Sequence, residues 1–590
     1  MSNSDKHNLD QYTIETTWST RLTDDIIMEA IQNEIPSEME SNILDNIAEC
    51  NIDKNRTDKE IFIKFLSFIL KENTPKPIQA VSVQLGNSAK IDYPLDAFHW
   101  GLTLLKECRD SNLYTIVPRR DTALGKEVYI VPRLILTKAV RDRIDKLQYL
   151  PPMKKPPIPW KNNYNGGWMW ENKHLVLGSH FNQHDKPLAY DVINKLQSIP
   201  WEIDPSTYLF EKDTNEQLNR NQFLRVMDEY IDKHFYFVWR YDKRGRSYSS
   251  GYDLNLQNNE YGKALLSMHK KEVITQLPFL YISIANLAGK DKLTWQERVN
   301  WAANQDINEI KWEKPMLGRK ALRAVQDAEC QKPSGYTMSL DATSSGIQIM
   351  AVISGCEKTA KYVNCIDPNK RYDLYGEVVK MMNKKLKHKV KRLEVKQATM
   401  THFYNSEARP KALLKKEGQL EVFYEVVNGL LPGAEQVMNT INNCWQSNKD
   451  HHSWIMPDSH QVYIPVKVDV KGTYTDPEFG RIRVEWEQIG TSDDYRSLCP
   501  NVIHSIDGYI AREMVRRCKF QLVHVHDCFL FHPNHFLAVK DNYRKIMAEI
   551  AKSDLFGSIL RQLMGSSSLR VKRKNNTLDS FIVNSEYMLS

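Results

Sequence analysis

Two aspartates in this chain stand where a buried strand is expected to end. In QLVHVHDCFLFHP (521–533) apolar residues lie on both sides of Asp527, which predicts two strands joined by a tight turn. In YTMSLDATSSGIQIMAVISG (336–355) a short strand pattern ends at Asp341, and an apolar helical run follows. Mg2+ prefers oxygen ligands and usually takes one or two protein carboxylates together with substrate phosphates. The pair therefore predicts a cation site for phosphoryl transfer, although either aspartate alone is more often a turn or capping residue.

A basic segment is the third chemical feature. RLEVKQATMTHFYNS (392–406) carries Arg392, Lys396 and Tyr404. On a helix, at about 100° per residue, these three side chains fall within roughly a third of the circumference. Two cations and an aromatic ring on one face suit the triphosphate and base of a nucleotide. The alternative is a solvated basic face with a tyrosine in the core.

In this order the three segments resemble the signature motifs of the single-subunit DNA-dependent RNA polymerases of the phage and mitochondrial type. DATSSGIQ (341–348) is similar to the first palm motif, the basic segment to the fingers helix, and HDC (526–528) to the second palm motif, where the family usually has His-Asp-Ser. The resemblance extends over about residues 150–590. Further segments that are similar to family segments are 156–168, 242–268, 285–298, 373–379 and 499–512.

The resemblance implies roles for individual residues. Two Mg2+ ions are expected on Asp341 and Asp527, and the catalytic set is Asp341, Asp527, Lys396, Tyr404 and His526. The residues expected around the incoming nucleotide are Arg392, Lys396, Tyr404, Lys292, Tyr375, His504 and Gly346. The residues expected to contact nucleic acid are Arg244, Arg246, Lys263, Lys467, Lys471, Arg481 and Arg483.

Two other functions remain open. DNA polymerases of the same right-hand fold typically carry a glutamate five residues after the first aspartate, where it blocks a ribose 2′-hydroxyl, and another after His-Asp. Here these positions are Gly346 and Cys528, which favours ribonucleotides. A non-catalytic nucleic-acid-binding relative is the third hypothesis, and the presence of both aspartates, Lys396 and Tyr404 argues against it.

The resemblance also implies an α-rich α/β fold of the right-hand polymerase type. Between Asp204 and the stretch FYFVW little chain is left for a thumb, which suggests a weak grip on the hybrid or help from another protein. The expected division is an N-terminal domain (1–205), a reduced thumb (206–234), the first part of the palm (235–357), the fingers (358–504, including a hairpin over 461–489) and the second part of the palm (505–590).

The expected hairpin is a candidate for reading a promoter. The even-numbered positions from Val462 to Val470 are apolar and share one face, and Ile482, Val484 and Trp486 share a face of the second run. A two-stranded ribbon fits the major groove of DNA. An ordinary structural hairpin is the alternative.

Asn405 follows Tyr404 where the family usually has glycine, and Gln397 stands where arginine often follows the lysine. Sugar selection and closing of the fingers are therefore expected to differ from the family pattern.

The amino-acid composition is compatible with these expectations but is not evidence for them. Lys+Arg 80 against Asp+Glu 73 is mildly basic, and the nine cysteines form no C-x-x-C zinc motif or evident disulfide framework. No run reaches the roughly 18 apolar residues of a membrane helix. The expected partners are the DNA template and promoter, nascent RNA, ribonucleoside triphosphates and an accessory protein for promoter opening, with no membrane. We expect a phage enzyme transcribing phage genes in the host bacterial cytoplasm.

Overall fold

The computed structural model forms two compact units. One comprises residues 1–151, 216–223 and 467–490, and the other comprises 152–215, 224–466 and 491–590. The structure describes residues 37–50, 58–70, 74–89, 91, 93–122, 125–134, 150–169, 173–210, 230–251, 254–306, 309–571 and 573–590.

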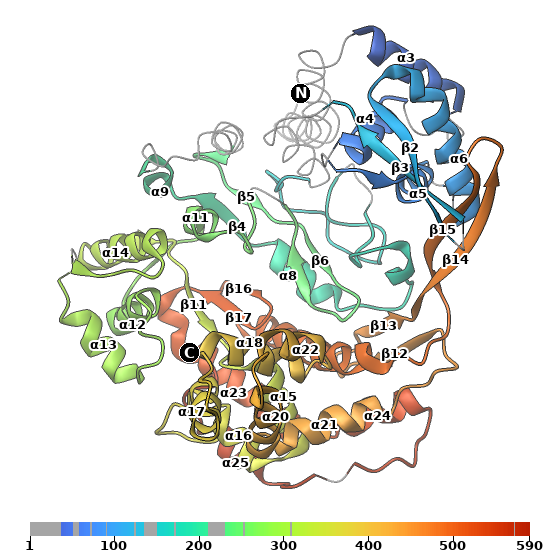
Figure 1. Ribbon diagram of the computed structural model, residues 1–590. Coiled ribbons are helices and arrows are strands. Elements are labelled where there is room, and N and C mark those ends of the chain that lie inside the picture. The colour runs from blue at the N-terminus through green and yellow to red at the C-terminus, as the bar shows by residue number, and fades with distance from the viewer. Residues whose placement is uncertain are drawn as a thin grey trace. The chain divides into compact units, whose positions relative to one another are not determined.

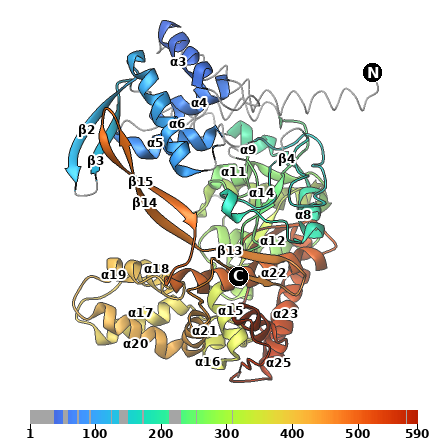
Figure 2. The same ribbon diagram turned by 90° about the vertical axis from the view of Figure 1, so that its right-hand side faces the viewer.

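The first unit packs helices against a small sheet (Figure 2). The sheet runs in the order β1-β3-β15-β14, and β2 also pairs with β3. Its helices are α3 (Ser37–Cys50), α4 (Asp58–Leu70), α5 (Ile78–Ser88) and α6 (Pro94–Glu107), followed by the short η2 (Cys108–Ser111). Its strands are β1 (Lys76–Pro77), β2 (Tyr114–Thr122), β3 (Gly125–Pro132), β14 (Lys467–Asp476) and β15 (Gly480–Ile489). The apolar helix predicted from KEIFIKFLSFILKEN is α4.

The predicted hairpin over 461–489 is wrong in its first strand. Gln461–Pro465 forms β13, which pairs with β12 (His451–Ile455), and only β14 pairs with β15. Pro465, which has no N–H to donate to a ladder, is the last residue of β13, and β14 begins at Lys467. The sequence grouped the hairpin with the fingers, whereas β14 and β15 pack in the first unit, where Ile482 and Val484 are fully buried.

A three-stranded sheet lies at the centre of the second unit, in the order β11-β17-β16 (Figure 1). The strands are β11 (Met338–Asp341), β16 (Leu522–Val525) and β17 (Cys528–Phe531). The two strands predicted around Asp527 are confirmed, with His526 and Asp527 as the turn between paired Val525 and Cys528. Three mutually packed helices, α15 (Ser345–Ser354), α22 (Leu498–Arg517) and α23 (Phe536–Lys552), supply the apolar support, and every residue of α15 from 347 to 354 is buried.

Most other elements of the second unit are helices, so the α-rich α/β class is confirmed. The helices are α8 (Tyr190–Gln197), α9 (Pro205–Phe210), α11 (Glu260–Leu265), α12 (Leu277–Leu287), α13 (Trp295–Ala303), α14 (Pro315–Glu329), α16 (Glu357–Tyr362), α17 (Leu374–Lys385), α18 (Arg392–His402), α19 (Ala408–Leu413), α20 (Gln419–Leu430), α21 (Pro432–Asn442), α24 (Leu555–Met564) and α25 (Leu578–Ile582). The remaining strands are β4 (Pro200–Ile203), β5 (Phe235–Tyr236), β6 (Trp239–Tyr241), β7 (Ser247–Ser249), β8 (Leu266–Met268), β9 (Glu272–Val273) and β10 (Pro333–Ser334).

The division into palm, fingers and thumb stays a prediction. Residues 211–229, most of the expected thumb, lie outside the described residues. Among the helices that the structure describes, none is both long and apolar enough to cross a membrane.

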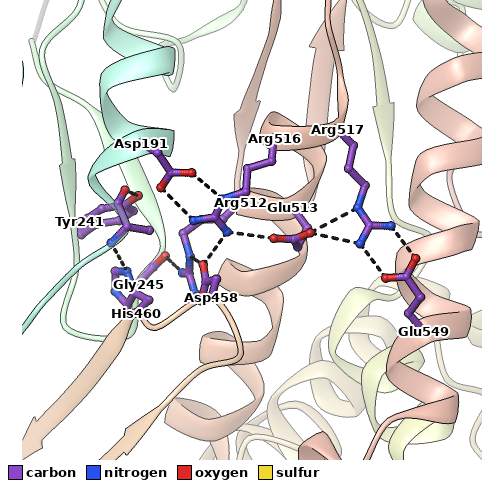
Figure 3. A network of polar contacts seen from close by, with 11 residues as sticks. Asp191, Tyr241, Gly245, Asp458, His460, Arg512, Glu513, Arg516, Arg517 and Glu549 are labelled. Atoms are coloured by element: carbon purple, nitrogen blue, oxygen red, sulfur yellow. Dashed lines mark hydrogen bonds and ion pairs between the residues drawn. The ribbon is translucent and has the colours of Figure 1, made fainter.

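A buried ion-pair network fixes the loop 242–246 beside α22 (Figure 3). Arg512 of α22 is fully buried, donates to Asp458 at 2.6 Å and to the carbonyl of Gly245 at 2.6 Å. Gly245 has φ +85°, and a Cβ there would lie 2.6 Å from the Arg512 guanidinium, so only glycine fits. The network therefore sets where the flanking arginines, Arg244 and Arg246, leave the backbone.

Candidate active site

A cavity of about 330 Å³ in the second unit gathers most of the residues predicted to carry chemistry. Its walls come from the ends of β11 and β16–β17, the start of α15, and helices α17 and α18. The predicted residues that line it are Lys292, Asp341, Gly346, Tyr375, Arg392, Lys396, Tyr404 and Asp527. Segments far apart in the sequence thus meet at one concave surface.

Strand pairing brings the two aspartates together. Asp341 is the last residue of β11 and pairs with Cys528, the residue after Asp527. The backbone of Ala342 also donates to the carbonyl oxygen of Asp527 at 3.2 Å. The two acids consequently share one end of the sheet, as the strand-end pattern predicted.

Both carboxyl groups resist ionisation. Burial, followed by the charge of Asp527, raises the pKa of Asp341 to about 6. Burial and the nearby Asp507 likewise raise the pKa of Asp527, while a hydrogen bond from Ser345 opposes the shift. Two neighbouring carboxylates that disfavour their own charge and remain accessible from the cavity are a donor set that a divalent cation neutralises, so these residues fit Mg2+.

The opposite wall carries the cations. Arg392 at the start of α18 makes a two-pronged ion pair with Asp373, at 2.9 and 2.7 Å. The Lys396 ammonium lies 5.9 Å from the centre of the Tyr375 ring, over which the Arg392 guanidinium also lies. Arginine and lysine side chains bind phosphate groups. A wall that carries both and lies near two acids therefore suits a nucleoside triphosphate.

Tyr404 does not share a helix face with these cations as predicted, because α18 ends at His402. The tyrosine instead lies in the turn after the helix, and it still reaches the cavity. Its hydroxyl lies against Gly346, where any Cβ would collide with it. The absence of a side chain at position 346 is therefore required by Tyr404.

His504 supports the other side of Tyr404. The two rings lie 4.9 Å apart, centre to centre. Arg244, held by Asp242 at 2.9 and 2.7 Å, lies with Nη1 2.7 Å from His504 Nδ1. Burial and the neighbouring arginines keep the pKa of His504 far below its usual range, so the ring is neutral. An arginine can only donate, which leaves the ring proton on Nε2.

The sequence analysis missed Asp507. This buried acid accepts from Arg246 at 3.0 Å. Burial raises its pKa, whereas Arg246 lowers it. Because Asp507 follows His504 by three residues on α22, both fall on one helix face. A lone acid on an otherwise apolar helix face was the available signal. Asp291, Arg371, Asp373 and Ser590 also line the cavity without having been predicted.

Other predicted residues do not line the cavity. His526 has φ +56° in the turn, and its Nε2 lies 3.0 Å from the side-chain nitrogen of Gln257. Arg244 contacts His504, which packs on Tyr404, and the charge of Arg246 acts on Asp527. Lys263 lies in α11.

The four predicted hairpin cations belong to the first unit. Register places Lys467, Lys471, Arg481 and Arg483 on the face of the ribbon away from buried Ile482 and Val484. Three of them pair with glutamates of the same ribbon: Lys467 with Glu487 at 3.0 Å, Lys471 with Glu485 at 3.9 Å, and Arg483 with Glu485. Alternating charges of both signs make this ribbon less basic than its lysines and arginines alone suggested.

Comparison with known proteins points to one family. Residues 274–457 match the family model described as DNA-dependent RNA polymerase. A probable DNA-directed RNA polymerase of Gelasinospora sp. (strain G114) is 24% identical over 528 residues, covering 72% of this chain and 63% of the relative. The DNA-directed RNA polymerase of Pseudomonas phage phiKMV is 25% identical over 333 residues, covering 40% of this chain and 41% of that protein.

The T7 RNA polymerase of Escherichia phage T7 is 29% identical over 170 residues, covering 26% of this chain and 19% of that protein. This chain therefore spans less than two thirds of the length of these relatives. They come from a fungus and from phages, so the expected phage origin stays a prediction. The chain is thus similar, over part of its length, to single-subunit DNA-directed RNA polymerases of fungal and phage origin.

Proposed function

We propose that this protein is a DNA-directed RNA polymerase, a nucleotidyltransferase that extends RNA along a DNA template. The single observation that carries the proposal is the meeting of Asp341 and Asp527 in one cavity with Arg392 and Lys396. Acids that attract metal ions and cations that attract phosphates are the two halves of a phosphoryl-transfer site.

Each wall of the cavity has its own task. Asp341 and Asp527 would hold Mg2+, which would supply charge stabilisation at the reacting phosphate. Arg392 and Lys396 bind phosphates of the incoming ribonucleoside triphosphate, with Lys292 as a further contact. The reaction joins the RNA 3′-oxygen to the α-phosphorus and releases pyrophosphate.

Sugar choice follows from the pairing of Gly346 with Tyr404. Gly346 has no side chain to clash with a ribose 2′-hydroxyl, and neutral His504 keeps a ring N–H as a donor near the Tyr404 ring. A DNA polymerase of this fold would need a bulky acid at position 346, where Tyr404 leaves no space. The geometry thus supports ribonucleotides over deoxyribonucleotides.

Primer extension tests the proposal. An RNA primer on a DNA template is incubated with Mg2+ and either ribonucleotides or deoxyribonucleotides, with Asp527→Asn as the control. We expect extension with ribonucleotides that Asp527→Asn abolishes while the variant still binds the template. Extension by deoxyribonucleotides alone would support the DNA polymerase hypothesis, and a folded protein that binds without extending would be a binding module.

Promoter contacts by β14–β15 and an accessory protein for promoter opening belong to the same proposal. Arg244 and Arg246, the nucleic-acid contacts expected in the loop 242–246, lie on backbone that Arg512 holds in place. Lys263, in α11, is the third expected contact. Transcription from one template that is fully duplex, compared with one that is single-stranded over the start site, separates unaided from assisted initiation.

A further inference from the structure

Three potential metal ligands converge at the end of β17 opposite Asp527. Glu272 belongs to β9, and His532 and His535 lie at the short turn η7 (Pro533–His535) that follows β17. One ligand atom from each lies within 4.8 Å of the others. Across the part of the chain that the structure describes, this is the one such group of three.

The Glu272 carboxylate faces both imidazoles. Its Oε1 lies 2.9 Å from His535 Nε2, and its Oε2 lies 3.9 Å from His532 Nδ1. In a tetrahedral site with metal–ligand bonds of about 2.0–2.2 Å, ligand atoms stand roughly 3.4 Å apart. Small side-chain rotations therefore bring the three ligand atoms to the spacing of a metal site.

The surrounding contacts hold this arrangement in place. The Asn534 side chain donates to the carbonyl of Val273 at 2.9 Å and accepts from the backbone N–H of Thr275 at 2.9 Å. Phe520 stacks on the His535 ring at 4.0 Å, with the two planes 5° apart. The two backbones and one ring are thus fixed independently of any ion, which is the preorganisation that metal sites need.

His532 is poorly satisfied by the protein alone. Its side chain is almost fully buried, and within the described residues its Nε2 has no hydrogen-bond partner. Its Nδ1 is the nitrogen nearer Glu272, and it accepts a long bond of 3.4 Å from the Asn534 N–H. A buried imidazole with one unpaired nitrogen and one weak hydrogen bond lies beside an acid and a second imidazole, which is the environment of a metal ligand.

We propose that Glu272, His532 and His535 bind a transition-metal dication of the Zn2+ class, which clips β9 to the hairpin that carries Asp527. Two imidazoles and one carboxylate leave a fourth position for water. Glu272 is 42% exposed, which gives the ion access from solvent. Imidazole ligands disfavour Mg2+, so this ion is distinct from those proposed at Asp341 and Asp527.

Cobalt binding tests the proposal without relying on polymerase activity. The full chain, carrying no polyhistidine tag and stripped with chelator, is titrated with Co2+ and read by visible absorption, and Zn2+ is counted by mass spectrometry. We expect one ion per chain with the intense visible bands of four-coordinate Co2+. Glu272→Gln and His535→Ala, both at solvent-accessible positions, should lose the bands and the Zn2+-induced rise in melting temperature.

His451→Ala is the matched control. His451 Nδ1 lies 2.7 Å from Asp450, so this pair repeats the histidine–carboxylate contact without a third ligand. The His451→Ala variant should bind the ion as the parent does. The double variant Asp341→Asn/Asp527→Asn should also bind it as the parent does. Absence of a bound ion in the parent, undiminished binding by folded Glu272→Gln and His535→Ala, or loss of the ion with the two aspartates would each overturn the proposal.

Discussion

Asn405 and Asn442 exchange two amide hydrogen bonds, at 2.8 and 3.0 Å. Asn405 directly follows Tyr404 and has φ +62°, the left-handed region that glycine adopts more readily. Its amide also donates to the carbonyl of Arg496 at 3.2 Å. The side chain at this unusual position therefore ties the end of α18 to α21 and to the segment before α22.

This tie predicts a role in sugar discrimination. Asn442→Ala removes both amide bonds and loosens the turn that carries Tyr404. Two hydrogen bonds of about 0.5–1.5 kcal/mol each limit the loss in discrimination between ribo- and deoxyribonucleotides to roughly 5- to 150-fold. The measurement is the ratio of kcat/KM values for the two sugars. Asn443→Ala, at the exposed neighbouring position, should leave that ratio unchanged.

The Gly346–Tyr404 contact gives a second prediction. Gly346→Ala places a methyl group against the tyrosine hydroxyl, so we expect kcat/KM for ribonucleotides to fall by about tenfold or more. Adding Tyr404→Phe removes the colliding oxygen and should restore part of the loss. Gly429→Ala in α20, where a Cβ meets nothing within 4 Å, is the control and should be neutral or slightly stabilising. If the effects of Gly346→Ala and Tyr404→Phe on kcat/KM were simply additive, the proposed contact would be contradicted.

The raised pKa of Asp341 predicts a pH-dependent penalty on stability. Because the pKa of Asp341 is raised to about 6, the folded protein holds this proton more tightly than the unfolded chain, whose aspartates titrate near about 3.9. The stabilisation from that proton is complete below about pH 4 and is lost as the pH rises through 6.

Asp341→Asn should therefore raise the melting temperature of the metal-free protein at pH 8, by a modest amount because the Asp341 side chain is open to solvent. The gain in melting temperature should shrink toward zero between pH 6 and 4, and thermal melts across that range measure it. Saturating Mg2+ at pH 8 should stabilise the parent and not the variant. A gain independent of pH would indicate another cause.

The network around Arg512 gives a fourth prediction. Asp458→Asn leaves a fully buried guanidinium without its carboxylate, and loss of about 3–5 kcal/mol of folding free energy is expected. Although burial alone raises the pKa of Asp458, Arg512 and its neighbours hold it well below its ordinary value. The difference between parent and variant is therefore full above about pH 4 and declines at lower pH.

Chemical denaturation at pH 7 and pH 3 measures this difference. Asp494→Asn is the matched control, because Asp494 also pairs with an arginine, Arg496, but on the surface. That variant should change stability by less than about 1 kcal/mol. Equal effects of the two substitutions would show that burial of the Asp458 pair is not what matters.

Local patterns predicted much of the site. Strand ends placed Asp341 and Asp527, and charge spacing on one helix placed Arg392 and Lys396. Asp507 was missed because a single acid on a buried helix face resembles an error in the apolar pattern until its partner, Arg246, is brought from a distant loop. Pro465 was visible in the sequence, but only the pairing of β13 with β12 revealed that it divides the expected hairpin.

The close approach of Gly346 and Tyr404 has a consequence for evolution. Any lineage moving toward deoxyribonucleotide use by enlarging position 346 would first pass through an enzyme with a displaced tyrosine. A larger residue at position 346 therefore requires the Tyr404 side chain to move. This dependence between neighbours would restrict the accessible mutational routes and help keep the substrate preference stable over time.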